Sequence, residues 1–283
     1  MKRVRIISAT RYSELHFRRY SKLGVALQKI SYDPNICISI LYQNCMPNGV
    51  GLAELFNQYL HPQYEKEILL FVHDDVYIDD FFLSFRLNEA IARYDVIGVA
   101  GNRTLPSPEI SWVLDRNLAD GFYWQAKEKL SGAVAHFNSA GERVSQYGDV
   151  PSDCRLIDGC FMAVNAERVL ASGARFDKQF KFHFYDLDFC RTCDQNGLKI
   201  GTWPIAVTHD SGGAFGSEAW EHACKDYFAK WYPDQPVPHF SDAEQTAPSS
   251  IPESSGQCGV SEQRSAVNSN ASITNPNFGP ISG

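Results

Sequence analysis

Apolar and polar positions form short alternating blocks along the first hundred residues. The apolar blocks predict strands over residues 3–8, 35–41, 68–72 and 95–100. Between them, helical spacing of apolar residues predicts helices over 13–30, 51–60 and 80–93. Strands that alternate with helices indicate βαβ units in a mostly parallel sheet. The pattern therefore predicts an α/β fold whose first half binds a nucleotide.

The pattern changes after Gly101. Residues 102–154 carry scattered aromatic residues, prolines and short apolar runs such as 133–137, which predict loops with a small hairpin, forming a lid or wall over the site. Two more strands are expected at 155–164 and 199–207, and Pro204 favours an edge or bulged position for the second. Helices are expected at 165–171, 186–196 and 217–231, with Gly197 ending the second of them.

The last part of the chain has a different composition. From residue 241 onward Ser, Pro, Asn, Gln and Gly dominate. Such a segment buries too little apolar surface to offset its ordering entropy, so we expect 241–283 to be a disordered tail, or a linker to a further domain. Residues 1–240 are then one folded domain, with a nucleotide-binding half at 1–100 and an acceptor half at 101–240.

Charge and composition exclude several classes of protein. The 283-residue chain has a net charge of −7 and no basic block, which argues against a nucleic-acid binder. No apolar run is long enough for a signal peptide or a membrane span, so we expect a cytoplasmic protein, with room for peripheral membrane contact. Eight cysteines are then thiols, and the pair Cys190 and Cys193 has no second pair with zinc-site spacing.

Two carboxylates follow the most apolar strand. Asp74 and Asp75 stand just beyond residues 68–72, at the strand end where ligands collect in open α/β sheets. Burying such charges is costly unless they are paired or metal-bound, so the stretch predicts a divalent-metal site that holds phosphates. A strand followed by a plain polar turn is the alternative.

Two further clusters carry candidate chemistry. Asp186 and Asp188 open a helix, where they either cap the helix or supply a general base. His209 follows a strand in a glycine-rich turn, and is either structural or shares a metal with Asp75. An imidazole together with carboxylate and phosphate oxygens suits Mn²⁺ or Mg²⁺.

The order of these segments resembles a family 2 glycosyltransferase of the GT-A fold, over roughly residues 3–232. The matching segments, in order, are the loop at 8–11, the helix GLAELFNQYL, the strand end FVHDDV, the strand LIDGCFMAVNAERV, the segment GARFDKQF, the helix start YDLDFCRTC and a terminal His after a strand. Each motif is weak alone, and the agreement lies in their order.

The resemblance implies a single Rossmann-like, mostly parallel sheet with a small antiparallel acceptor-side portion. It also implies an inverting transfer from a nucleotide-diphosphate sugar, UDP-sugar favoured, to a hydroxyl of a glycan or small molecule, in bacterial glycan or glycoconjugate biosynthesis. Asp186 would be the base, and Asp75 with His209 would hold Mn²⁺ or Mg²⁺. The implied donor contacts are Thr10, Arg11, Glu14, Asn57 and Asp74, and the implied acceptor contacts are Asp158, Gly159 and Trp124, with Trp112 nearby.

The chain departs from the family pattern at two positions. His73 stands where the aspartate motif would place an acid, and Tyr185 replaces the acidic neighbour of the base. A non-catalytic nucleotide- or glycan-binding domain of the same fold therefore stays open. A sugar nucleotidyltransferase is a further alternative, although its phosphate loop would be glycine-rich and SATRYSELH has no glycine.

The tail should be dispensable, because it lacks core-forming residues. We expect a protein truncated after Ser241 to keep the melting temperature and the nucleotide affinity of the full chain. Thermal unfolding and calorimetry check this, and a large fall in melting temperature would show that the tail packs on the domain.

Overall fold

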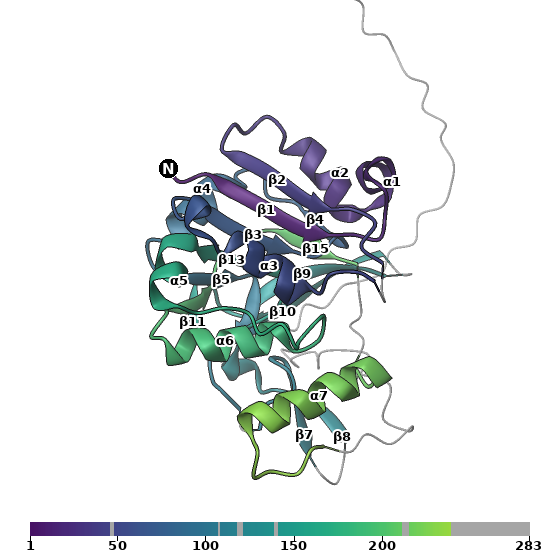
Figure 1. The fold of residues 1–283 in the computed structure, drawn as a ribbon, viewed down its shortest axis with the longest axis vertical. Helices are drawn as coiled ribbons and strands as arrows, with labels where there is room; N and C mark the ends of the chain where they lie inside the picture. Colours follow the sequence, from purple (N-terminus) through teal and green to yellow (C-terminus); the bar gives the residue numbers. More distant parts are fainter. Residues whose placement is uncertain (46–47, 107, 118–120, 139–140, 211–214, 239–283) are drawn as a thin grey trace, which may run out of the picture. The chain divides into compact units, whose positions relative to one another are not determined.

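The computed structural model describes residues 1–45, 48–106, 108–117, 121–138, 141–210 and 215–238. These residues form a mixed α/β structure with seven α-helices, a seven-stranded sheet, a six-stranded sheet and a two-stranded hairpin (Figure 1). The expected single Rossmann-like sheet is therefore wrong. The expected tail at 241–283 lies outside the described residues.

The first sheet has the strand order β11-β14-β5-β13-β3-β1-β2. Its strands are β1 Val4–Ala9, β2 Ile36–Leu41, β3 Ile68–Val72, β5 Val96–Gly98, β11 Ser152–Cys154, β13 Phe161–Asn165 and β14 Ile200–Thr202. β1 pairs parallel with β2 and β3, but β13 runs antiparallel between β3 and β5. Every residue of β3 and β13 is buried, which is typical of strands covered on both faces.

The helices are α1 Glu14–Tyr20, α2 Lys22–Lys29, α3 Leu52–Tyr59, α4 Leu83–Ala90, α5 Ala166–Ser172, α6 Tyr185–Gln195 and α7 Glu218–Trp231, with 3₁₀ turns η1 Pro62–Tyr64 and η2 Lys127–Lys129. The single helix expected over 13–30 is wrong. Ser21 adopts an extended conformation between α1 and α2, and its hydroxyl accepts a hydrogen bond from the Gly24 N–H. Ser21 therefore caps a second helix, and this helix packs against β4 (Figure 1).

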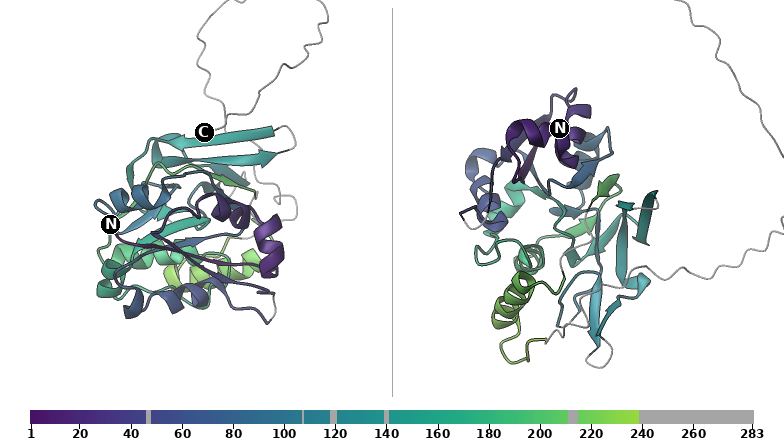
Figure 2. Two further views of the ribbon diagram at one scale, coloured as in Figure 1. Left: turned by 90° about the horizontal axis from the view of Figure 1, so that it is seen from above. Right: turned by 90° about the vertical axis from the view of Figure 1, so that its right-hand side faces the viewer.

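The second sheet has the order β12-β6-β9-β15-β4, and β10 pairs with β9. Its strands are β4 Val76–Ile78, β6 Ala100–Asn102, β9 Leu130–Asn138, β10 Gly141–Gly148, β12 Leu156–Ile157 and β15 Val207–His209. The long hairpin of β9 and β10 is prominent in the left view of Figure 2. A second hairpin joins β7 Leu114–Asn117 and β8 Gly121–Trp124. The loops with one small hairpin expected over 102–154 are therefore wrong.

The chain passes repeatedly between the two large sheets, and we call four of these short crossings the seam. The crossings are Val99 between β5 and β6, residues 73–75 between β3 and β4, residues 158–160 between β12 and β13, and residues 203–206 between β14 and β15. Each of the strands expected at 95–100, 155–164 and 199–207 is thus two strands. Pro204 lies in a crossing, where no ladder N–H is needed, and not in an edge strand.

Buried polar contacts attach α7 to α6 and to the loop before β7. The Glu109 carboxylate is buried, 2.7 Å from the Arg191 guanidinium, and accepts hydrogen bonds from the Tyr227 and Tyr232 hydroxyls. Buried charges need such pairing, so this network fixes the position of α7. Within the described ranges, no helix combines the length and apolar character that crossing a bilayer requires.

Candidate functional site

Polar residues meet at the seam because its backbone hydrogen bonds join different crossings. The His73 N–H donates to the Cys160 carbonyl at 3.0 Å, which holds the crossing after β3 beside the crossing before β13. The Asp210 N–H donates to the Asp75 carbonyl at 3.1 Å, which brings in the end of β15. Three segments far apart in sequence therefore deliver their polar side chains to one place.

His73, Asp75 and His209 form a candidate metal site. Each offers one ligand atom, and these atoms lie within 4.8 Å of one another. The His209 Nε2 and Asp75 Oδ1 atoms are 3.4 Å apart, and both are buried without a hydrogen-bond partner. Buried polar atoms normally have partners, so a cation between these two would satisfy both. The side chains of Asp75 and His209 keep 38% and 14% of their exposure, which leaves a route for an ion.

The charges of these groups are strongly coupled. Burial favours a raised pKa for Asp75, but the His209 and His73 imidazoles outweigh burial and hold the pKa of Asp75 below its usual value. Burial favours a lowered pKa for His209, but the Asp75 and Asp158 carboxylates outweigh it and raise the pKa of His209. Each shift favours the charged form of its group, so a metal ion at this site would compete with a proton for His209.

The Asp74 carboxylate contacts Thr10, whereas the Asp75 carboxylate lies next to His209. Its Oδ2 atom accepts a hydrogen bond of 2.6 Å from the Thr10 hydroxyl, just after β1. Burial raises the pKa of Asp74. The structure thus brings Thr10 and Asp74 together beside the candidate metal cluster, and their role as donor contacts stays a prediction.

Asp186 lies at the start of α6, half-buried and held by two backbone groups. The Gly159 N–H donates to its Oδ2 and the Leu187 N–H to its Oδ1, both at 3.0 Å. Burial and the nearby Asp158 charge raise the pKa of Asp186 to about 7. Phe184, two residues earlier, has the left-handed conformation with φ +62°, a strained arrangement for a side chain of that size. A carboxylate of fixed direction with a pKa near 7 is suited to proton transfer.

Asp158 connects the acid and the metal cluster. Its carboxylate accepts hydrogen bonds from the Trp112 indole at 2.8 Å and from the Cys160 N–H at 2.7 Å. The same carboxylate raises the pKa of both Asp186 and His209, so it lies within electrostatic range of both.

Asp188 faces the other way. It is fully buried, accepts a hydrogen bond of 2.8 Å from the Trp231 indole and pairs with the Lys230 ammonium at 2.7 Å. These contacts connect α6 to α7, so two carboxylates two positions apart in the chain have different surroundings.

Several residues predicted to contact a ligand are not brought to this cluster. The Asn57 side-chain NH₂ donates to the Phe176 carbonyl at 2.7 Å, and its side-chain oxygen accepts from the Phe176 N–H at 3.0 Å. Glu14 pairs with Arg18 on the exposed surface of α1, and Arg11 is exposed. Asn57 and Glu14 therefore have partners within the chain, and their role as donor contacts stays a prediction.

The tryptophans also differ from expectation. Trp112, and not Trp124, reaches Asp158. Trp124 lies against Tyr147, with ring centroids 6.4 Å apart, and its indole nitrogen is buried without a hydrogen-bond partner.

His73 is the residue that sequence reasoning missed. In the sequence His73 stands only as a replacement for an acid, and the expected ligand pair is Asp75 and His209. Asp74 and Asp75 form a turn between β3 and β4, so strand alternation gives no local signal that His73 and Asp75 face one place.

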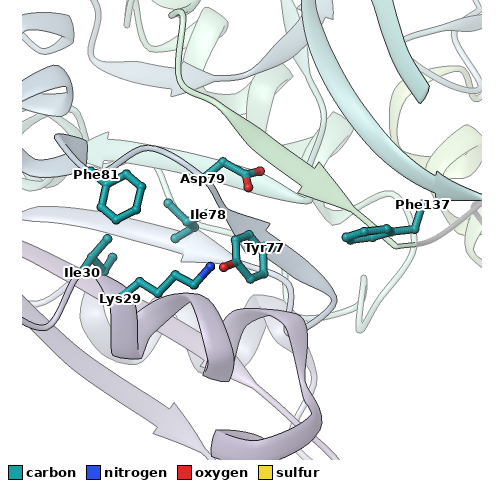
Figure 3. A pocket seen from close by; sticks show the side chains of 7 residues that line it. All are labelled: Lys29, Ile30, Tyr77, Ile78, Asp79, Phe81 and Phe137. Carbon is teal, nitrogen blue, oxygen red and sulfur yellow. The ribbon is translucent and has the colours of Figure 1, made fainter. Parts of the chain in front are cut away.

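A cavity of about 330 Å³ lies along β4, next to the seam but separate from the cluster (Figure 3). It is lined by Lys29, Ile30, Tyr77, Ile78, Asp79, Phe81 and Phe137. The Lys29 ammonium stands 5.0 Å from the centre of the Tyr77 ring, and Asp79 accepts a hydrogen bond from the Thr208 hydroxyl. This cavity shares no residue with the metal cluster or with Asp186, so it does not mark the reactive centre.

Comparisons with known proteins give only distant likenesses. No protein-family model matches the chain, and no curated protein matches its sequence. Similar solved structures include a protein from STIV (TM-score 0.41, 12% identity, 74% of this chain and 86% of that one). A second is the catalytic domain of Drosophila β1,4-galactosyltransferase 7 with xylobiose, with a TM-score of 0.42, 9% identity, and coverage of 72% of this chain and 66% of that one. A third is the mannosyltransferase PcManGT from Pyrobaculum calidifontis with GDP-Man and Mn²⁺, with a TM-score of 0.40, 12% identity, and coverage of 83% of this chain and 66% of that one. At these TM-scores we draw no conclusion from the likenesses.

Metal binding should depend on both Asp75 and His209. Loss of a group that merely supports a ligand typically weakens metal binding about 10- to 100-fold, so Asp75→Asn and His209→Ala should each weaken Mn²⁺ binding more than about a hundredfold. Calorimetric titration measures this, with circular dichroism to show that the fold is kept. Asp210→Asn is the matched control, because it removes a charge next to His209 and should bind Mn²⁺ normally. Wild-type affinity in His209→Ala would make His209 structural.

Proposed function

We propose that this chain is a metal-dependent glycosyltransferase that moves a sugar from a nucleotide-diphosphate donor to an acceptor hydroxyl, with inversion at the anomeric carbon. The observation that carries the proposal is a cation site and a proton-accepting acid on the two sides of one crossing. Cys160 of that crossing accepts from the His73 N–H, and Gly159 donates to Asp186. A diphosphate leaving group needs a cation, and the attacking hydroxyl needs a base.

His73, Asp75 and His209 would hold Mn²⁺ or Mg²⁺, and the orphaned Asp75 and His209 atoms support this fit. The bound ion would supply charge neutralisation for the diphosphate that leaves. Asp74, fixed by Thr10, stands beside these ligands and is suited to hydrogen-bond the ribose or the waters of the ion. A UDP-sugar is the favoured donor and a glycan or small molecule the acceptor.

Asp186 is proposed to take the proton of the acceptor hydroxyl as that hydroxyl attacks. Two backbone N–H groups fix the direction of its carboxylate, and a second lone pair on each oxygen remains to receive the hydroxyl proton. With a pKa of about 7, about half of the Asp186 side chains are deprotonated at neutral pH. Asp158, Gly159 and Trp112 border this carboxylate and would form the nearest part of the acceptor side, with Trp124 further along.

Replacing the base should abolish transfer without abolishing metal binding. General-base contributions are typically about 10² to 10⁴ in rate, so Asp186→Asn should lower transfer at least about a hundredfold while Mn²⁺ affinity stays near normal. An amide must turn its NH₂ toward one of the two N–H donors, so we expect a stability loss of about 1–2 kcal/mol. The assay is transfer from a panel of nucleotide sugars, selected first by slow donor hydrolysis.

Asp188→Asn is the matched control on the same helix, because its partners are Lys230 and Trp231. It should lower the melting temperature and keep most of the rate. Full transfer by Asp186→Asn would contradict the base role, and lost donor binding would move Asp186 to the nucleotide site. Nucleotide binding with no turnover in the wild type would favour a non-catalytic binding domain.

The rate should rise with pH through the pKa of the base. A base acts only when deprotonated, so kcat/KM measured at saturating Mn²⁺ should increase between pH 6 and pH 8 with a midpoint near the Asp186 pKa of about 7. The residual activity of Asp186→Asn should lack this rise. A rate that is flat or falls over this range in the wild type is the result that would count against Asp186.

A further inference from the structure

A hydrogen-bond chain runs from His73 through Tyr185 to Gly159. The His73 Nε2 atom is 2.8 Å from the Tyr185 hydroxyl, and this hydroxyl is 2.8 Å from the Gly159 carbonyl oxygen. A carbonyl only accepts, so the hydroxyl proton of Tyr185 goes to Gly159, and the Tyr185 oxygen accepts from His73. Nε2 of His73 therefore carries the hydrogen, and Nδ1 keeps a free lone pair.

Packing holds the Tyr185 side chain where its hydroxyl makes these two hydrogen bonds. Its side chain is 3% exposed, and its ring lies against Phe56 and Phe176 with centroids 5.8 and 6.2 Å apart. A Cβ on Gly159 would lie 2.5 Å from the Tyr185 hydroxyl oxygen, so only glycine leaves room for this contact.

The imidazole of His73 is also held from another direction. The ring of Phe182 stacks on it with centroids 5.8 Å apart and an interplanar angle of 18°. The side chain thus has one tautomer and one orientation before any ion arrives.

We propose that Tyr185 is a positioning residue that presents Nδ1 of His73 as the third metal ligand, and that the resulting two-imidazole, one-carboxylate site selects transition-metal dications over Mg²⁺. This inference rests on the metal site of the proposed function. Mg²⁺ prefers oxygen ligands, whereas imidazole nitrogen suits Mn²⁺, Co²⁺ and Zn²⁺ better. A metal-bound histidine generally donates its other N–H to a fixed acceptor, which here is the Tyr185 hydroxyl.

The two departures at positions 73 and 185 then have one explanation. A carboxylate at residue 73 would need no hydrogen-bond partner to choose its tautomer, but an imidazole does. The Tyr185 hydroxyl supplies that partner and contacts Gly159, the residue whose N–H also holds Asp186.

The test is calorimetric titration of the full chain with Mn²⁺ and with Mg²⁺. The wild type should bind Mn²⁺ more tightly than Mg²⁺. Tyr185→Phe keeps the ring packing and removes only the hydroxyl, so Mn²⁺ affinity should fall about 10- to 100-fold with little change for Mg²⁺. His73→Asp exchanges nitrogen for oxygen and should shift the preference toward Mg²⁺. Tyr94→Phe is the control, because it removes a buried hydroxyl that bonds to Asp153 instead.

Each result decides between the two proposals. Tyr185→Phe with wild-type Mn²⁺ affinity would overturn the positioning role and leave the metal site standing. A wild type that binds neither ion would overturn both. Should Tyr185→Phe not fold, as judged by its melting curve, the His73→Asp titration decides, and an unchanged ratio of Mn²⁺ to Mg²⁺ affinity would overturn the selectivity.

Discussion

Backbone that leaves one β-sheet for another loses its ladder partners, and this constraint organises the protein. Backbone N–H and carbonyl groups that are buried must find other partners. At the seam these backbone groups bond to one another. The N–H groups of His73, Asp158 and Asp210 donate to the carbonyls of Cys160, Ala100 and Asp75, respectively. Because these bonds join the crossings to one another or to neighbouring strand ends, segments far apart in sequence are fixed side by side. The polar side chains on those segments therefore converge.

Because these side chains converge, their charges lie close enough to shift one another's pKa values. The Asp158 carboxylate raises the pKa of Asp186 on one side and that of His209 on the other. Asp188 shows the contrast, because its partners Lys230 and Trp231 belong to α7 and attach that helix to the domain. Positions 186 and 188 of one helix thus have separate surroundings, one at the polar cluster of the seam and one at the contact with α7.

The sequence predicts most elements but not how they are divided between sheets. The run at 68–72 is a buried strand in the structure, and the expected helix at 217–231 is close to α7. The run at 155–164 was read as one strand because β12 and β13 are both buried, and burial does not say to which sheet a residue belongs. Sheet membership depends on long-range pairing, which periodicity does not contain.

The candidate site was predictable in part. Asp75 and His209 were expected to meet, and their ligand atoms are 3.4 Å apart. His73 was missed because its role depends on a tautomer set by Tyr185, and the partner of a side chain is a tertiary fact. The bond between the Asn57 amide and the Phe176 backbone is likewise a tertiary contact that the helix pattern does not contain.

The central claim is that the seam gathers His73, Asp75 and His209 around one ion. Anomalous diffraction from crystals of this protein soaked in Mn²⁺ tests it most directly, because the signal locates the metal without reference to activity. We predict one strong anomalous peak bounded by those three side chains. The absence of a peak there, or a peak at the Asp79 side of β4 instead, would contradict the account.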